Sequence, residues 1–415
     1  MRRVLFVVLS GLLALVFALA LAQDMRREWA HHQRQFRNSL QGDERRAAPR
    51  GIQQTIVKRL DRVDRCTTCH VAIEQPKLAL AEEPFTAHPG AYLTWHPTEQ
   101  FGCTVCHGGQ GLATEVKAAH GDVPHWEEPL LRGAFVQASC LQCHGNVSGI
   151  SGYAPLLAKG RALFEAKGCY GCHAVHDVGQ SVSVDLTPVG AKSYQLMEAD
   201  FENMPPPHDR IHWMQTKLHD PRVLNPGVRT EQLPKGEEEV FPSVMPNFGL
   251  TEEENLALTT YLLALNDADP PGSYTIPPEP TPVATYASDV ERGRAVFQRV
   301  GCTACHGVEG RGGRHSWNSA LGEEVPPLLH VKAYYGNDVE ALKRLIRNGR
   351  QPVPRAAPDR PQPGLYMPAW KDKVTESELD ALVAYLFSLA DALPHPAAVP
   401  PAAPENPPPA DDIPG

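Results

Sequence analysis

The most hydrophobic stretch of the chain lies at its start and predicts a membrane-crossing helix. Residues 4–22 are almost entirely apolar and follow Arg2 and Arg3. The stretch is long enough to span a bilayer, and the two arginines favour a topology in which the rest of the chain lies across the membrane. Ala20-Leu21-Ala22 would also suit a signal-peptide cleavage site. We expect a retained anchor over residues 1–22, and an extracytoplasmic location for the remainder in either case.

The next segment, residues 23–65, is polar with apolar residues at helical spacing, and it predicts a helical stalk. Trp29 and Phe36 lie within a stretch rich in Arg, Gln and His. His31 and His32 in this stretch are interpreted as part of a solvated helix face and not as metal ligands. We expect a second helix before the first cysteine, built on the apolar positions Ile52, Ile56, Val57 and Leu60.

The second half of the chain contains an internal repeat, and each copy begins and ends with a predicted helix. Residues 158–173 (AKGRALFEAKGCYGCH) align without gaps with residues 291–306 (ERGRAVFQRVGCTACH). Each copy later reaches a Met-Pro pair and a closing amphipathic stretch, at 245–265 and 367–389. In both closing stretches a Thr precedes acidic residues, which is typical of a capped helix start. The face expected to pack on the first helix carries the matching pairs Tyr261 and Leu265, and Tyr385 and Leu389.

Composition limits the number and kind of domains. A chain of 415 residues suggests about three domains, and its 40 prolines and 33 glycines indicate many loops and linkers. Residues 267–287 form a proline-rich linker, and residues 393–415 form a Pro/Ala-rich tail that we expect to be disordered. The net charge of −9 favours a positively charged redox partner and argues against nucleic acid.

The cysteines reveal the chemistry of the chain, because all ten lie in five copies of Cys-x-x-Cys-His. Two thiols at this spacing can form thioethers to the vinyl groups of a haem, and the adjacent histidine then reaches the iron. Zinc sites would need pairs of such motifs, and five motifs leave one over. The pattern therefore predicts five covalently bound haems c. The predicted attachment residues are Cys66 and Cys69, Cys103 and Cys106, Cys140 and Cys143, Cys169 and Cys172, and Cys302 and Cys305, with proximal ligands His70, His107, His144, His173 and His306.

The first three motifs lie in residues 66–155, where only histidines are available as distal ligands. No methionine occurs between Met25 and Met197. Four histidines in this segment lie outside the motifs, and His88, His96 and His120 are the preferred distal ligands, with His125 to spare. Two imidazoles give a lower reduction potential than an imidazole with a thioether. We therefore expect three low-potential haems here, with the porphyrins supplying much of the apolar interior.

The two repeat copies resemble class I single-haem cytochrome c domains, at 156–266 and 288–392. The resemblance rests on the helix that ends at Gly-Cys-x-x-Cys-His, the Met-Pro pair and the closing helix, and in the second copy also on CHGVEGRGG. It implies that Met245 and Met367 are distal iron ligands and that a proline carbonyl, from Pro188 or Pro327, holds each proximal imidazole. For the fourth haem other candidates remain open, namely Met197, Met204, Met214, His208, His212 and His219.

Together these features predict a mainly α protein with an N-terminal anchor helix, a loop-rich trihaem domain and two tandem cytochrome c-like helical domains. GCTVCHGGQG after an anchored helix is similar to membrane-bound multihaem cytochromes of bacterial respiratory chains. That resemblance implies electron transfer from a membrane quinol-oxidising or cytochrome b-type subunit to a soluble periplasmic redox protein, on the periplasmic face of the inner membrane.

Two enzymatic alternatives remain beside the carrier hypothesis. One is a multihaem oxidoreductase with one open iron, such as a peroxidase or a nitrite- or hydroxylamine-type reductase. Pentahaem nitrite reductases use a Cys-x-x-Cys-Lys motif, and this sequence has none. The other is direct quinol oxidation, for which a single membrane helix would be a poor site. An electron-transfer subunit is favoured over a stand-alone enzyme.

Overall fold

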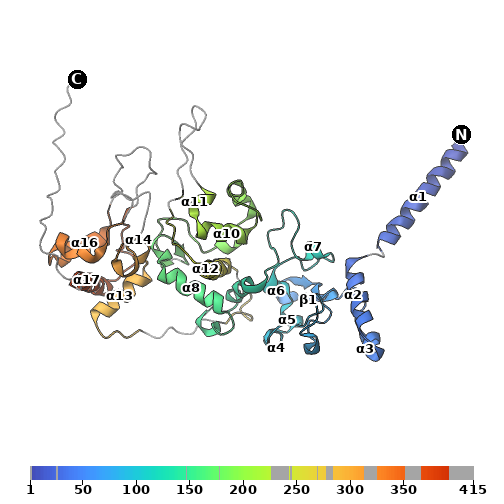
Figure 1. Ribbon diagram of the computed structural model, residues 1–415, viewed down its shortest axis with the longest axis horizontal. Coiled ribbons are helices and arrows are strands. Elements are labelled where there is room, and N and C mark those ends of the chain that lie inside the picture. The colour runs from blue at the N-terminus through green and yellow to red at the C-terminus, as the bar shows by residue number, and fades with distance from the viewer. Residues whose placement is uncertain are drawn as a thin grey trace, which may run out of the picture. The chain divides into compact units, whose positions relative to one another are not determined.

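The computed structural model shows a mainly helical protein, which confirms the expected fold class (Figure 1). It describes residues 2–24, 27–145, 147–176, 178–225, 243, 245–268, 270–276, 284–312, 325–350 and 366–391. These residues fall into two compact units, 1–283 and 284–415. The expected tail, 393–415, lies outside the described residues.

The N-terminal part contains three helices, of which α1 (Arg2–Asp24) has the length and apolar composition needed to cross a membrane. Helices α2 (Glu28–Ser39) and α3 (Gly42–Ala47) follow. One face of α2 is buried through Gln33 and Phe36. The Gln33 side chain donates a hydrogen bond to the carbonyl of Thr68, 3.0 Å away, inside the first Cys-x-x-Cys-His motif. Helix α2 therefore packs directly on the first motif.

The second helix expected before the first cysteine is wrong, because these residues form a hairpin. Strand β1 (Thr55–Val57) pairs antiparallel with β2 (Arg62–Asp64), so that Ile56 lies opposite Val63. The turn between them contains Asp61 in the left-handed conformation, with φ of 49°. Ile56, Val57 and Val63 are β-branched residues, which favour strands over helices.

The segment with the first three motifs consists of short helices joined by ordered loops. The helical elements are only one turn long, in keeping with the expectation of a loop-rich domain. They are α4 (Tyr92–Trp95), α5 (Thr98–Phe101), α6 (Thr104–His107) and α7 (Val116–Ala119), with a longer 3₁₀ segment at Gly133–Gln142.

The first repeat copy packs helix α8 (Pro155–Ala166) against α12 (Glu252–Ala264) around one apolar core. The core also receives residues of the preceding segment, among them Ala138 and Val147. The third motif and the first repeat copy thus share a core within one unit. The remaining elements here are β3 (Ala174–Val175), β4 (Val178–Gly179), α9 (Glu198–Phe201), α10 (Arg210–His219) and α11 (Pro221–Leu224).

The second repeat copy has the same plan, with α13 (Asp289–Arg299) packed against α17 (Glu376–Asp391). Phe297 and Tyr385 meet at 5.5 Å between ring centres, as Phe164 and Tyr261 do at 5.4 Å in the first copy. The expected packing of Tyr261 and Tyr385 on the first helix of each copy is therefore confirmed. The other helices of this copy are α14 (Thr303–His306), α15 (Val331–Tyr335) and α16 (Val339–Asn348).

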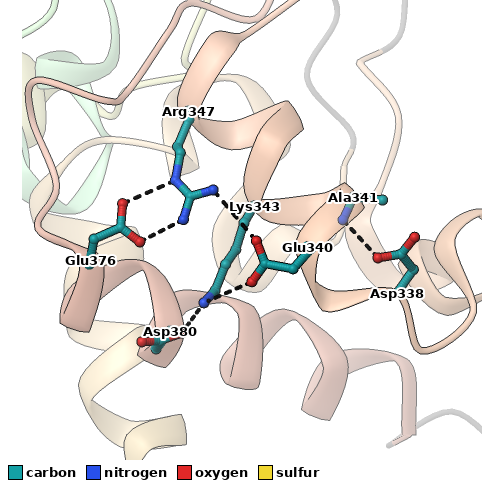
Figure 2. A network of polar contacts seen from close by, with 7 residues as sticks. All are labelled: Asp338, Glu340, Ala341, Lys343, Arg347, Glu376 and Asp380. Carbon is teal, nitrogen blue, oxygen red and sulfur yellow. Dashed lines mark hydrogen bonds and ion pairs between the residues drawn. The ribbon is translucent and has the colours of Figure 1, made fainter.

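Charged side chains hold α16 on α17 in the second copy (Figure 2). Arg347 of α16 donates two hydrogen bonds to the Glu376 carboxylate, at 2.6 and 3.0 Å. Lys343, one turn earlier, forms ion pairs with Asp380 of α17 and with Glu340 of its own helix. Because the acidic partners are largely exposed, the network contributes only modestly to stability and fixes mainly the register of the two helices.

Candidate haem sites

All five Cys-x-x-Cys-His motifs adopt the same hydrogen-bonded turn. In each, the backbone N–H of the histidine donates to the carbonyl of the first cysteine, at 2.9–3.0 Å. This helical i to i+4 spacing brings the first cysteine and the histidine to one side of the turn. None of the ten cysteines, all of which lie in the described part of the chain, forms a disulfide. The turn gives each motif two thiols and an imidazole on a five-residue frame.

Backbone carbonyls orient the imidazoles of His107, His173 and His306. The Nδ1 atoms of His107, His173 and His306 lie 3.3, 2.8 and 3.1 Å from the carbonyls of Leu131, Val184 and Pro326. A carbonyl can only accept, so each Nδ1 carries the proton and Nε2 is left as the free nitrogen. The proline carbonyls expected for this role, those of Pro188 and Pro327, are therefore wrong.

The structure gives a reason for both corrections. Pro327 caps the short 3₁₀ helix that starts at Leu328, so its carbonyl is committed to that turn and the preceding Pro326 faces the imidazole. Pro188 similarly caps the 3₁₀ helix Val189–Ala191, and Val184 takes its place.

Burial favours the neutral form of the motif imidazoles. Desolvation lowers the pKa of all five, namely His70, His107, His144, His173 and His306. For His70 the nearby carboxylate of Glu83, 3.8 Å away, opposes this effect, and His120 and His32 reinforce it. A neutral imidazole is the form that binds a metal.

The three preferred distal histidines each face one motif histidine. The ring centres of His70 and His120 lie 6.4 Å apart, those of His107 and His88 6.3 Å, and those of His144 and His96 6.2 Å. His125 is exposed. The structure thus places each of the three beside a different motif histidine. The sequence alone had left this pairing open.

These separations fit a metal held between two imidazoles. Iron–nitrogen bonds of about 2 Å, plus about 1.1 Å from each nitrogen to its ring centre, give a centre-to-centre distance of about 6.2 Å. Among the described residues, no group of three or more His, Cys, Asp or Glu side chains could hold a bare metal ion. Two opposed imidazoles with a pair of thiols beside one of them match the donor set of a covalent haem, which supplies reversible one-electron chemistry when bound.

The methionines expected as ligands in the two repeat copies lie at the cores that contain the matching cysteines. Met245 packs on the core that Cys169 also contacts, and Met367 packs on the core that Cys302 contacts. Both methionines are partly exposed, and the Met367 carbonyl accepts a hydrogen bond from the N–H of Arg350 at 2.8 Å.

The other candidates for the fourth haem have different surroundings. Met197 and Met204 are buried in a separate cluster, and the ring of His208 stacks on Phe201 of that cluster while its Nε2 lies 2.9 Å from the Met204 carbonyl. Met214 is buried in the same core that Met245 contacts. His212 lies in α10, and His219 is exposed at the end of that helix.

Neighbouring motifs are in direct contact within the first unit. The thiols of Cys66 and Cys103 are hydrogen-bonded to each other, which lowers the pKa of Cys66 and raises that of Cys103. Burial raises the pKa of Cys106 to about 11, and the nearby Cys140 and Cys143 add to this effect. The attachment points of the first three motifs therefore form one continuous row.

The row of attachment points reaches the fourth motif through the shared apolar core, which Cys140 and Cys169 both contact. The linker adds a further support at the third motif. Ile276 pairs with His144 through a short backbone bridge, and its N–H donates to the Cys143 carbonyl at 2.7 Å. Residues 270–276 are thus docked on the third motif, an arrangement that the proline content alone did not indicate.

Sequence reasoning missed three polar side chains at the motifs. Asp64 is 1% exposed, and its Oδ2 accepts hydrogen bonds from the N–H groups of Cys103 and Thr104 at 2.6 and 3.2 Å. Arg132 lies 3.2 Å from the Nδ1 of His120, and the Nδ1 of His32 is buried without a hydrogen-bond partner among the described residues. For Asp64 its place two residues before a motif cysteine is the only signal in the sequence.

Comparison with known proteins supports this interpretation. The model of the Cytochrome c family matches residues 157–266 and 290–390, just over half of the chain. The chain is 25% identical over 238 residues to the Cbb3-type cytochrome c oxidase subunit CcoP of Azospirillum sp. (strain B510), covering 56% of this chain and 62% of that protein. It is 32% identical over 108 residues to the protein of the same name from Azospirillum brasilense, covering 26% and 30%.

The chain thus spans less than two thirds of the length of these curated relatives. No solved structure matches it significantly. The family match coincides with the two repeat copies, each of which has the helix, the Cys-x-x-Cys-His turn and the closing helix described above. The chain therefore belongs to the cytochrome c family, and it is a c-type cytochrome with covalently bound haem that transfers electrons.

Proposed function

We propose that this protein is a membrane-anchored pentahaem cytochrome that passes electrons from a membrane quinol-oxidising partner to a periplasmic acceptor. The observation that carries the proposal is the identical hydrogen-bonded turn of all five motifs, three of which lie outside the family match. In each motif the turn holds a partly buried histidine on the same short frame as two cysteines. Each motif therefore holds one haem through its two cysteines and its histidine.

The division of ligands gives the proposed current a direction. The three motifs of 66–155 pair with histidines, whereas those of 156–266 and 288–392 have Met245 and Met367. A thioether ligand favours the reduced iron, so the two methionine sites have the higher potentials. Electrons consequently run from the anchored trihaem segment toward the C-terminal domain.

Residues 1–22 anchor the protein, and the haem-bearing remainder lies on the periplasmic face of the membrane. The proposal rests on α1, which is exposed along its length and whose apolar stretch follows Arg2 and Arg3. The curated relatives carry the name of a subunit of a membrane oxidase. By analogy we propose that this chain also works beside a membrane subunit, of the quinol-oxidising or cytochrome b type.

A haem count and a spin-state measurement on the purified full chain test the proposal. Intact mass should show five haems, and the oxidised protein should be entirely low-spin, with three bis-histidine and two histidine–methionine signals. Fewer than five haems would reject the pentahaem assignment. A substantial high-spin fraction that binds nitrite, peroxide or cyanide would instead favour a multihaem oxidoreductase with one open iron.

The partner is tested separately by fractionation and reduction. The full chain should sediment with membranes. Quinol should reduce its haems only when the membrane fraction is present. Direct reduction of the purified protein by quinol would replace the proposed partner with a quinol site on this chain.

A further inference from the structure

We propose that the first three haems are cross-ligated. By this we mean that none of them takes as distal ligand the nearest suitable histidine that follows its own motif. His120 serves the first motif, His88 the second and His96 the third. This inference deepens the proposed function and rests on it, because it requires three haems in residues 66–155. The simplest alternative is sequential: each motif would use the nearest suitable histidine that follows it.

The geometry of the rings separates the two arrangements for the first two motifs. His88 follows the first motif in the sequence, yet its ring faces His107 of the second motif at 6.3 Å. His120 follows the second motif, yet it faces His70 of the first at 6.4 Å. The pair 88–107 is therefore nested within the pair 70–120, and the pair 96–144 crosses both.

Backbone hydrogen bonds hold each distal histidine in its place. The N–H of His88 donates to the Ile73 carbonyl at 2.8 Å, and its Nδ1 lies 2.9 Å from the Pro89 carbonyl. Because that carbonyl accepts the Nδ1 proton, Nε2 of His88 is the nitrogen available to a metal. The same arrangement orients His107 opposite.

The other two distal histidines are each fixed at the end of a one-turn helix. His96 closes α4, donates its N–H to the Tyr92 carbonyl at 2.8 Å, and packs edge-on against Phe101 at 4.9 Å. His120 closes α7, and its carbonyl accepts the N–H of Leu130 at 2.9 Å. These contacts fix the backbone of both residues and, for His96, also the ring.

Arg132 is the group that distinguishes the first pair from the others. A guanidinium only donates, so the contact of Arg132 with the Nδ1 of His120 places the ring proton on Nε2. Ligation through Nε2 requires that proton to move to Nδ1 and Arg132 to turn toward Asp122, whose carboxylate already lies 3.9 Å away. Neither His88 nor His96 has an arginine contact of this kind in the described part of the chain.

The angles between the imidazole planes give each pair a spectroscopic signature. The planes of His70 and His120 are tilted by 38°, whereas those of His88 and His107 meet at 78° and those of His96 and His144 at 72°. Bis-histidine iron with nearly perpendicular rings gives a highly anisotropic low-spin signal in electron paramagnetic resonance. Rings closer to parallel give an ordinary rhombic signal.

The spectrum of the oxidised wild-type protein is the first test. It should contain two highly anisotropic signals and one rhombic signal from the three bis-histidine haems. His120→Met should remove the rhombic signal alone, and His88→Met and His96→Met should each remove one anisotropic signal. His125→Met is the matched control and should leave all three unchanged, because His125 is exposed and faces no motif histidine.

Removal of the second haem provides the second test and separates the two anisotropic pairs. In Cys103→Ala/Cys106→Ala, whose loss of one haem is verified by intact mass, adding His88→Met should change no remaining signal. Adding His96→Met to the same background should still remove the other anisotropic signal.

The outcomes distinguish this inference from the proposed function. A wild-type mass with fewer than five haems rejects the proposed function, and fewer than three haems on residues 66–155 also rejects cross-ligation. Two outcomes with five haems present would overturn cross-ligation alone. One is loss of the rhombic signal in His88→Met. The other is a signal change caused by His88→Met in the variant that lacks the second haem. If the double cysteine variant does not fold, three rhombic signals or three anisotropic signals in the wild type would overturn it equally.

Discussion

Gly293 of α13 lies directly on the backbone carbonyl of Ala381 in α17. A Cβ atom built at Gly293 would stand 1.9 Å from that oxygen, and one built at Gly160 would stand 2.0 Å from the carbonyl of Ala257 in the first copy. The two repeat copies therefore bring their first and last helices into backbone contact at the same point. The contact sets the distance at which the closing helix crosses the helix that leads into the motif.

Replacing either glycine by alanine should destabilise its own repeat copy. The backbone atoms of the opposing helix cannot move aside as a flexible side chain would, so we expect a loss of about 1–3 kcal/mol for Gly160→Ala and for Gly293→Ala. Denaturant unfolding followed by circular dichroism measures the change. Gly152→Ala, where nothing lies within 4 Å of the added atom, should be close to neutral. Equal destabilisation by all three would contradict the packing argument.

The closing helix of the first copy should lose stability in acid through Glu254. The carboxylate accepts from Lys167 at 2.8 Å and from the N–H of Thr251 at 3.1 Å, and these contacts, that of Lys167 first, hold its pKa below the usual 4.5. A lowered folded-state pKa contributes stability above the unfolded value, and that contribution is lost as the pH falls through the folded value.

Glu254→Gln should therefore cost about 0.5–1 kcal/mol at neutral pH. The difference from the wild type should disappear once the pH falls well below about 4. Urea unfolding at a series of pH values measures it. Glu252→Gln removes the same charge from the same helical turn without breaking the Lys167 ion pair, and it should show a smaller, less pH-dependent effect. A gap that widens in acid would contradict the assignment.

Met245 and Met367 should each be needed for one histidine–methionine signal. Replacing either with alanine should abolish the thioether-to-iron absorption of its own haem and raise the high-spin fraction by about one haem in five, under the proposed count. Met204→Leu is the control, because Met204 is buried in a separate cluster with Phe201 and Leu224. Loss of the signal in Met204→Leu, with Met245→Ala unaffected, would transfer the fourth ligand to Met204.

Under the proposed haem assignment, Asp64 should influence both the fold and the reduction potentials of the first two haems. Asp64→Ala leaves the buried N–H groups of Cys103 and Thr104 without an acceptor, at a cost of about 1–3 kcal/mol. Asp64→Asn keeps an acceptor oxygen but removes a negative charge beside two oxidisable centres, so it should raise the reduction potentials of low-potential haems only. Redox titration measures this. The control is Asp61→Asn, at an exposed neighbouring residue, and it should leave the reduction potentials unchanged. A shift in potential equal to that of Asp64→Asn would assign the effect to surface charge.

The elements that the sequence predicted well are those with local signals. Both closing helices begin with a capping pair, Thr251 with Glu254 and Thr375 with Glu378. Such a cap can be recognised from a sequence of only four residues. The hairpin at Thr55–Asp64 was missed because the same apolar residues satisfy a helical and an alternating spacing over so short a stretch. There the β-branched residues and a left-handed turn decided the outcome.

The candidate ligands could be chosen from the sequence, but their pairing could not. The absence of methionine between 25 and 197 left only histidines for three motifs, which is a matter of composition. Which histidine meets which motif depends on contacts between residues 48–50 positions apart, as for His96 with His144 and His70 with His120. The same holds for Arg132 and Asp64, whose partners come from neighbouring segments.

The shared turn of the motifs also bears on the order in which the protein matures. The turn needs only the hydrogen bond from the histidine N–H to the first cysteine carbonyl, so a nascent chain can form it as soon as those five residues are free to fold. The imidazole pairs, in contrast, require chain that is made later: His70 must wait for His120. Under the proposed pairing, covalent loading can proceed one motif at a time on an unfolded chain. The ligand pairs of 66–155 are then completed in the order in which His107, His120 and His144 are made.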